Sequence, residues 1–256
     1  MAGFFFSLLP FVLLFSMCGT HMQDQPGKEI PRWFFILEAI CYFCYRMLDE
    51  MDGKQARRTG NSSPLGLLFD HGLDAFTMGF QAMVMTKCFQ VGDNIRAVLS
   101  VAAPCASFHF STLEEYYTGG LFLGPFNGVT DGSAAVYLSF LIMTIAGNDF
   151  WRWPIANQGT AGEVLLVDLI VFVNVVIQIV VILSCLKNIF EHQKKQLAPG
   201  EVTGEPLNTK DLVVQIVGYF IPMVALTLLV LMGKEPILNY TALSAELNPL
   251  FYLILL

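Results

Sequence analysis

Residues 164–186 read VLLVDLIVFVNVVIQIVVILSCL, an apolar run with one charged side chain, Asp168. A helix needs about 20 such residues to cross the hydrocarbon core of a bilayer, so this stretch predicts a membrane span. Comparable apolar runs recur at 1–20, 30–49, 65–91, 97–113, 132–146 and 212–232, and a last one begins near Pro236. The sequence therefore predicts an all-α polytopic membrane protein with about eight transmembrane helices.

The composition of the whole chain agrees with a membrane protein. Of its 256 residues, 55% are hydrophobic and 14% are charged, whereas roughly a quarter of the residues of a soluble domain are charged. The mean hydropathy is +0.59. The formal net charge of −7 offers no basic surface for nucleic acid. A cleaved signal peptide is the alternative for residues 1–20, but no basic residue precedes that apolar run.

The chain divides at its one long polar stretch. We expect a six-helix core over residues 1–186, a cytosolic loop over 187–211 and accessory transmembrane helices over 212–256. The final apolar run breaks off at the last residue, which predicts a truncated C-terminus. Lys and Arg are nearly balanced between the two sides, but their density over 54–58 and 187–195 favours a cytosolic side for those segments.

Four aspartates gather where the second and third predicted spans meet. Asp49 and Asp52 close one span, and Asp70 and Asp74 lie in the first turns of the next. On helices, spacings of three and four residues put each pair on one face, and the short link makes those faces neighbours. Four carboxylates in a low-dielectric site repel one another unless cations lie between them. Ligation by oxygen alone selects Mg²⁺ or Mn²⁺, with Ca²⁺ as the alternative.

Small residues and an arginine accompany the aspartates. Gly53 and Ala56 lie beside the first pair, and Gly66 continues the stripe of the second pair, which leaves open space above the carboxylates. Arg57 offers a planar guanidinium that matches the oxygens of a phosphate. Together these features predict a diphosphate substrate. The alternative, ordinary helix-end aspartates in water, accounts poorly for four such residues at this spacing.

The complete pattern reads Asp49-x2-Asp52-Gly53-x2-Ala56-Arg57-x8-Gly66-x3-Asp70-x3-Asp74. It agrees at every fixed position with the signature of the CDP-alcohol phosphotransferase family, which this chain resembles. Residues 52–60, 63–66 and 69–72 resemble the eukaryotic choline and ethanolamine phosphotransferases in particular. Residues 114–124 resemble the ethanolamine type more than the choline type.

The resemblance implies a fold of ten helices with a six-helix catalytic core, often a homodimer, in the endoplasmic reticulum or Golgi membrane. It implies transfer of phosphoethanolamine or phosphocholine from CDP-ethanolamine or CDP-choline to diacylglycerol, which releases CMP and forms phosphatidylethanolamine or phosphatidylcholine at a site facing the cytosol. The implied ligands of two Mg²⁺ or Mn²⁺ ions are Asp49, Asp52, Asp70 and Asp74. The implied nucleotide contacts are Gly53, Ala56, Arg57 and Gly66.

The residue that accepts the proton of the attacking hydroxyl is a separate question. His71 adjoins the carboxylate cluster, and imidazole titrates near neutral pH, which suits a general base. Asp74 is the alternative, although a metal ligand is a weak base. His109 could reach the same cavity, but a packed residue is the simpler interpretation. Two glutamates and two tyrosines over 114–117 are candidates for binding a cationic head group.

Two features depart from the family pattern. Leu67 stands where close relatives generally carry Glu, which one turn before His71 would orient the imidazole and stabilise its charge. The chain is also predicted to stop two or more spans early. The alternatives are therefore a catalytically weak, truncated subunit that modulates a full-length enzyme, or a cation transporter that uses the aspartates as an ion path.

Overall fold

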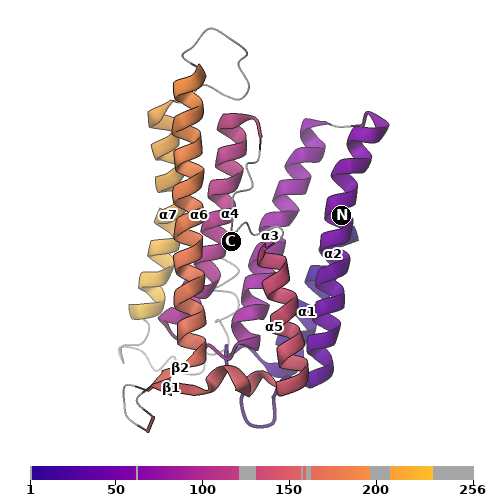
Figure 1. Ribbon diagram of the computed structural model, residues 1–256, viewed down its shortest axis with the longest axis vertical. Coiled ribbons are helices and arrows are strands. Elements are labelled where there is room, and N and C mark those ends of the chain that lie inside the picture. The colour runs from indigo at the N-terminus through magenta and orange to yellow at the C-terminus, as the bar shows by residue number, and fades with distance from the viewer. Residues whose placement is uncertain are drawn as a thin grey trace.

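The computed structural model describes residues 2–61, 63–120, 131–156, 158–159, 163–196 and 208–232. In these ranges the chain is a bundle of helices aligned along one long axis (Figure 1). The helices are α1 (Ala2–Cys18), α2 (Arg32–Thr59), α3 (Pro64–Cys88), α4 (Ile95–Thr118), α5 (Asp131–Ala146), α6 (Leu166–Gln196) and α7 (Thr209–Met232). A 3-10 helix η1 (Asn148–Arg152) and a short antiparallel pair, β1 (Pro154–Ala156) and β2 (Val164–Leu165), join α5 to α6.

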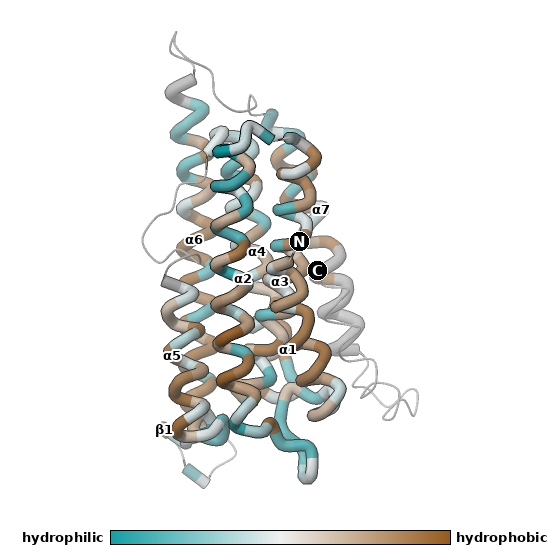
Figure 2. Tube along the Cα trace, turned by 90° about the vertical axis from the view of Figure 1, so that its right-hand side faces the viewer, coloured by the Kyte–Doolittle hydropathy of each residue, from teal (hydrophilic) through white to brown (hydrophobic). Residues whose placement is uncertain are grey.

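Each of the first seven predicted spans coincides with a helix, and the one near Pro236 lies outside the described residues. Within the described part of the chain, α6 is the helix that is long and apolar enough to cross a membrane, over Leu166–Gln193. α1 and α5 are shorter apolar helices. α2 is hydrophobic along much of its length and hydrophilic toward its C-terminal end (Figure 2). The mostly helical class is thus confirmed, while the count of eight spans stays a prediction.

α6 is longer than the sequence predicts, since it ends at Gln196 and the predicted span ends at 186. Lys187 Nζ lies 3.7 Å from Glu191 Oε1, and such an i,i+4 pair stabilises helix that has left the apolar region. The segment 187–211, predicted as a loop, therefore begins as helix, and α7 starts before it ends.

Two hydrophobic clusters hold the helices together. The larger cluster contains side chains from each of the helices α1, α2, α3, α4 and α5 and from the start of α6. Its fully buried side chains include Leu14, Phe35, Met83 and Phe140. The smaller one joins α4, α6 and α7 around Phe110. Figure 1 shows α4, α6 and α7 on one side and α1, α2, α3 and α5 on the other, and α4 and α6 contribute to both clusters. α3 and α4 pack against each other and connect the two groups.

A tight turn brings the end of α2 to the start of α3. Gly60 has a left-handed backbone (φ 67°), and its N–H donates to the last-turn carbonyl of Arg57, which is the common glycine C-cap of a helix. Ser63 then caps α3, because its Oγ accepts the N–H of Gly66 at 3.1 Å, and Pro64 occupies the first helical position. The four aspartates consequently flank one short connection.

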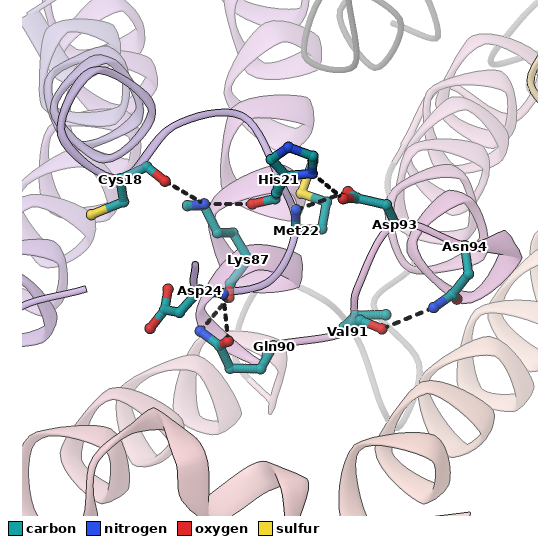
Figure 3. A network of polar contacts seen from close by, with 9 residues as sticks. All are labelled: Cys18, His21, Met22, Asp24, Lys87, Gln90, Val91, Asp93 and Asn94. Atoms are coloured by element: carbon teal, nitrogen blue, oxygen red, sulfur yellow. Dashed lines mark hydrogen bonds and ion pairs between the residues drawn. The ribbon is translucent and has the colours of Figure 1, made fainter. Parts of the chain in front are cut away.

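A polar network closes the opposite end of α3, as Figure 3 shows. Lys87 is fully buried, and its Nζ donates to the carbonyl of Cys18 at 3.2 Å and to that of His21. His21 Nδ1 lies 2.5 Å from Asp93 Oδ2, and the other oxygen of that carboxylate accepts the N–H of Met22 at 2.9 Å. The network ties the segment after α1 to the turn between α3 and α4.

Candidate functional site

A pocket of about 540 Å³ opens between the start of α1, the C-terminal half of α2 and the N-terminal half of α3. Every fixed residue of the predicted signature lines it: Asp49, Asp52, Gly53, Ala56, Arg57, Gly66, Asp70 and Asp74. The convergence of the two helix faces, expected from residue spacing alone, is therefore present in the structure.

Three of the four carboxylates lie close together. Asp49, Asp70 and Asp74 each offer an oxygen within 4.8 Å of the others, and all three side chains are half-buried. Oxygen ligands around one Mg²⁺ at about 2.1 Å lie within roughly 4.2 Å of one another, so the cluster is close to the spacing of a divalent cation site. Asp52 lines the same pocket but is exposed and stands outside this group.

Two residues of α2 that sequence analysis missed hold these carboxylates. Tyr45 is buried, and its Oη donates to Asp74 Oδ1 at 3.0 Å. Arg46 Nη1 donates to Asp49 Oδ2 at 3.1 Å. Arg46 stands three residues before Asp49 on the same helix, so the i,i+3 spacing could have revealed that pair. The contact of Tyr45 with α3 could not be read from local spacing.

The residues predicted to contact the nucleotide lie beside the carboxylates, toward the turn between α2 and α3. Arg57 Nη1 would lie 3.5 Å from a Cβ built on Gly53, so the guanidinium folds over that glycine. A Cβ on Gly66 would approach Ser63 Oγ to 3.2 Å, which crowds the oxygen that caps α3. Among the described residues Arg57 forms no ion pair, so its donors are available to an anion.

The side chain of His71 is not among those lining the pocket. Its Nε2 lies 3.5 Å from Glu115 Oε2 on α4. Leu67, the position where the sequence lacks the expected glutamate, lines the pocket instead. His71 therefore lies outside the pocket lining that contains the carboxylates. The carboxylate near its ring comes from Glu115 of α4 and not from position 67 of α3.

The other candidates of α4 have structural contacts. His109 stacks on Tyr219 of α7, with ring centroids 4.4 Å apart and planes inclined by 10°. Glu114 is buried, and its Oε1 accepts the side-chain N–H of Asn188 on α6 at 2.6 Å. Tyr117 belongs to the α4, α6 and α7 cluster. These contacts leave Glu115 as the acidic residue of this segment that faces α3.

The family model described as "CDP-alcohol phosphatidyltransferase" matches residues 3–124. Residues 3–124 are therefore similar to a CDP-alcohol phosphatidyltransferase domain. The matched region contains α1 to α4 and therefore the whole lining of the pocket, together with His71 and Glu115. The family is membrane-embedded, in agreement with the apolar helices of the chain.

Curated relatives align with much of the same region. An uncharacterized CDP-alcohol phosphatidyltransferase class-I family protein of Schizosaccharomyces pombe is 42% identical over 121 residues, which are 47% of this chain and 31% of the relative. A Dictyostelium discoideum protein of the same description is 36% identical over 143 residues, or 56% of this chain and 36% of the relative. Choline/ethanolaminephosphotransferase 1 of Arabidopsis thaliana is 34% identical over 148 residues, or 58% and 38%. The aligned segments span about a third of these relatives' length.

Proposed function

We propose that this protein transfers phosphoethanolamine or phosphocholine from a CDP-alcohol to diacylglycerol and releases CMP. The observation that carries the proposal is the pocket, which gathers all the fixed signature residues, with three carboxylates within 4.8 Å. The family of residues 3–124 and the name of the Arabidopsis thaliana relative support the reaction class. The resemblance of residues 114–124 to the ethanolamine type makes CDP-ethanolamine the first substrate to test.

The carboxylates would hold the divalent ions of the reaction. Asp49, Asp70 and Asp74 would be the central ligands of this site. Asp52 lines the same pocket and would be the fourth ligand. Bound Mg²⁺ or Mn²⁺ ions supply charge that neutralises the diphosphate and stabilises the CMP leaving group. Tyr45 and Arg46 hold the carboxylates in place, which preorganises the site.

The remaining signature residues would bind the nucleotide end of the substrate. The guanidinium of Arg57 can donate two parallel hydrogen bonds to phosphate oxygens. Gly53, Ala56 and Gly66 line the pocket without bulky side chains, so a nucleotide can approach the helix backbones. In this arrangement the carboxylates and their metal ions lie at the diphosphate, and Arg57 lies toward the CMP portion of the substrate.

The group transfer itself is a substitution at phosphorus. The diacylglycerol hydroxyl oxygen forms a bond to the β-phosphorus, the bond from that phosphorus to the bridging oxygen breaks, and CMP leaves with the electron pair. His71 takes the hydroxyl proton in our proposal, because it follows Asp70 directly and has a carboxylate partner. Asp74 is the second candidate, since it lines the pocket itself.

We place the enzyme in the endoplasmic reticulum or Golgi membrane with the pocket at the cytosolic face, and the homodimer stays a prediction. The turn between α2 and α3 and the C-terminal end of α6 lie at the same end of the bundle (Figure 1). The two basic segments that favour a cytosolic side, 54–58 and 187–195, therefore lie at the same end of the bundle. No observation favours the transporter or the modulating subunit over this function.

Diacylglycerol-dependent release of CMP by the purified protein in lipid nanodiscs tests the proposal. We expect release from CDP-ethanolamine or CDP-choline in the presence of Mn²⁺ or Mg²⁺, with CDP-ethanolamine used at least as well. A protein that releases no CMP alone but raises the rate of a full-length relative would instead support the modulating subunit. Cation flux into protein vesicles without CMP release would support the transporter.

A further inference from the structure

We propose that the chain binds a membrane phospholipid in an apolar groove between α2 and α5, with an acyl chain along the groove and the phosphate at Arg32. The groove is separate from the pocket of the signature residues. The bound lipid is therefore neither the CDP-alcohol nor the acceptor of the proposed reaction, and the inference does not depend on that reaction.

The groove has a volume of about 720 Å³, and the side chains that line it are almost all apolar. Ile36, Ile40 and Phe43 of α2 form an exposed wall, and the fully buried Phe140 of α5 lies at the bottom. Thr144 also lines it, but its Oγ1 donates to the Phe140 carbonyl at 2.8 Å. At 1.5 Å per residue the wall extends about 10 Å along α2, which suits part of an acyl chain.

The groove and the signature pocket use opposite faces of α2. Ile36 and Ile40 line the groove, whereas Tyr45 and Asp49 line the pocket. Each pair, 36 with 45 and 40 with 49, is nine residues apart, and residues at that spacing point in nearly opposite directions on a helix. A lipid in the groove therefore leaves the pocket free.

Arg32 lies at the end of the groove, between the first turn of α2 and the last turn of α5. It is one turn before Ile36, and its Nη1 donates to the carbonyl of Ile145 at 3.5 Å. Its Nη2 would lie 3.8 Å from a Cβ built on Gly147, just after α5. Figure 1 shows that this end of the bundle is opposite the turn between α2 and α3.

The Arg32 guanidinium has donors to spare for an anion. Its side chain is exposed, and among the ion pairs of the described residues none involves Arg32. The bond to Ile145 uses one of the five N–H donors of the group and holds it at the groove. A guanidinium held in this way can donate two parallel hydrogen bonds to a phosphate.

A phospholipid is the ligand that satisfies both parts of this site. Diacylglycerol has acyl chains but no phosphate, and a CDP-alcohol has phosphates but no acyl chain. Trp33, next to Arg32, is 50% exposed, and exposed tryptophans concentrate at the level of lipid head groups. Basic residues between transmembrane helices at that level bind lipid head groups. The phosphate therefore belongs to the leaflet opposite the α2–α3 turn.

Native mass spectrometry of the purified full chain, stripped of lipid in detergent and titrated with dioleoylphosphatidylglycerol, tests the proposal. We expect saturable binding that Arg32→Gln weakens about tenfold, because charge-assisted hydrogen bonds to the phosphate are lost. Arg32→Lys should weaken it about threefold, since the charge stays and the paired donors are lost. Neither dioleoylglycerol nor inorganic phosphate at the same concentration should displace the lipid.

Matched variants separate this site from general effects of charge or bulk. Ala39→Leu, inside the groove, should weaken binding about fivefold by filling space that the acyl chain needs. Ala135→Leu, at an exposed position of α5 outside the groove lining, should leave binding unchanged. Arg152→Gln, an exposed arginine of η1 at the same end of the bundle, should also leave it unchanged. None of these positions lines the signature pocket, so CMP release should not change.

Three results would overturn the inference. They are wild-type affinity in Arg32→Gln, an equal loss of affinity in Arg152→Gln, and displacement of the phospholipid by dioleoylglycerol. A lipid-free dimer that Ala39→Leu converts to monomers would also overturn it, because the groove would then join two copies of the chain. A protein that binds the phospholipid in this way but releases no CMP would overturn the proposed function alone.

Discussion

At the scale of single residues, Arg57 is the sharpest probe of nucleotide binding. We expect Arg57→Lys to lower kcat/KM for the CDP-alcohol about tenfold or more, although the positive charge is kept, because an ammonium group cannot form two parallel hydrogen bonds to phosphate. The measurement is the substrate dependence of CMP release. Lys54→Arg, on the same helix and exposed in an ion pair with Glu50, is the control. Unchanged kinetics in Arg57→Lys would place Arg57 in solvent.

Leu67 shows what long-range contacts add to a sequence pattern. In the sequence alone, Leu67 provides no carboxylate to orient the His71 imidazole. On that basis, Leu67→Glu is expected to raise the rate of CMP release about tenfold. In the structure the Glu115 carboxylate of α4 already lies 3.5 Å from His71 Nε2, so we expect Leu67→Glu alone to raise kcat less than about threefold. A tenfold gain in the otherwise wild-type chain would show that Glu115 does not support His71.

At the scale of elements, the turn between α2 and α3 sets the distance between the carboxylate pairs. Gly60 has φ 67° with nothing within 4 Å of a built Cβ, so Gly60→Ala should destabilise the protein by about 1 kcal/mol through backbone strain alone. It should also raise the Mn²⁺ concentration needed for activity, because the strained turn holds Asp49 and Asp70 less well. Thermal unfolding and Mn²⁺ titration measure the two effects.

Gly218→Ala is the control for that prediction. Gly218 lies inside α7, has ordinary helical φ and also has nothing within 4 Å of a built Cβ. Replacing it should leave stability unchanged or raise it by up to about 1 kcal/mol. Equal effects of both substitutions would mean that the turn does not depend on its left-handed glycine.

The helices and the site differ in how far the sequence predicts them. Apolar runs located seven helices, and the spacing of Asp49, Asp70 and Asp74 predicted their convergence, because both signals are local and periodic. Local patterns could not reveal the Tyr45 contact with Asp74 or the Glu115 contact with His71, which join different helices. The extension of α6 was missed because the prediction followed hydropathy and ignored an i,i+4 ion pair.

At the scale of the whole molecule, the Lys87 network fastens the end of the bundle opposite the pocket. Lys87→Met would leave the carbonyls of Cys18 and His21 unpaired and remove a buried positive charge near Asp24 and Asp93. We expect a loss of about 2–4 kcal/mol of stability, because a buried carbonyl left without its hydrogen bond costs roughly 1–3 kcal/mol. The Mn²⁺ requirement of folded protein should not change, since the network lies at the far end of α3.

Thermal unfolding in nanodiscs checks that prediction against Lys187→Met. Lys187 is 71% exposed and pairs with Glu191, so its loss should cost at most about 0.5 kcal/mol. If Lys87→Met unfolds at the wild-type temperature, the network contributes nothing to holding α1 against α3.

The central claim is that the carboxylates of α2 and α3 form a divalent metal site for transfer from a CDP-alcohol. The metal dependence of diacylglycerol-dependent CMP release, compared between wild type and Asp70→Ala, tests it most directly. We predict no release by the wild type in excess EDTA, full release after addition of Mn²⁺, and no release by folded Asp70→Ala at any Mn²⁺ concentration. Full activity of the wild type in excess EDTA, or wild-type rates in Asp70→Ala, would contradict the account.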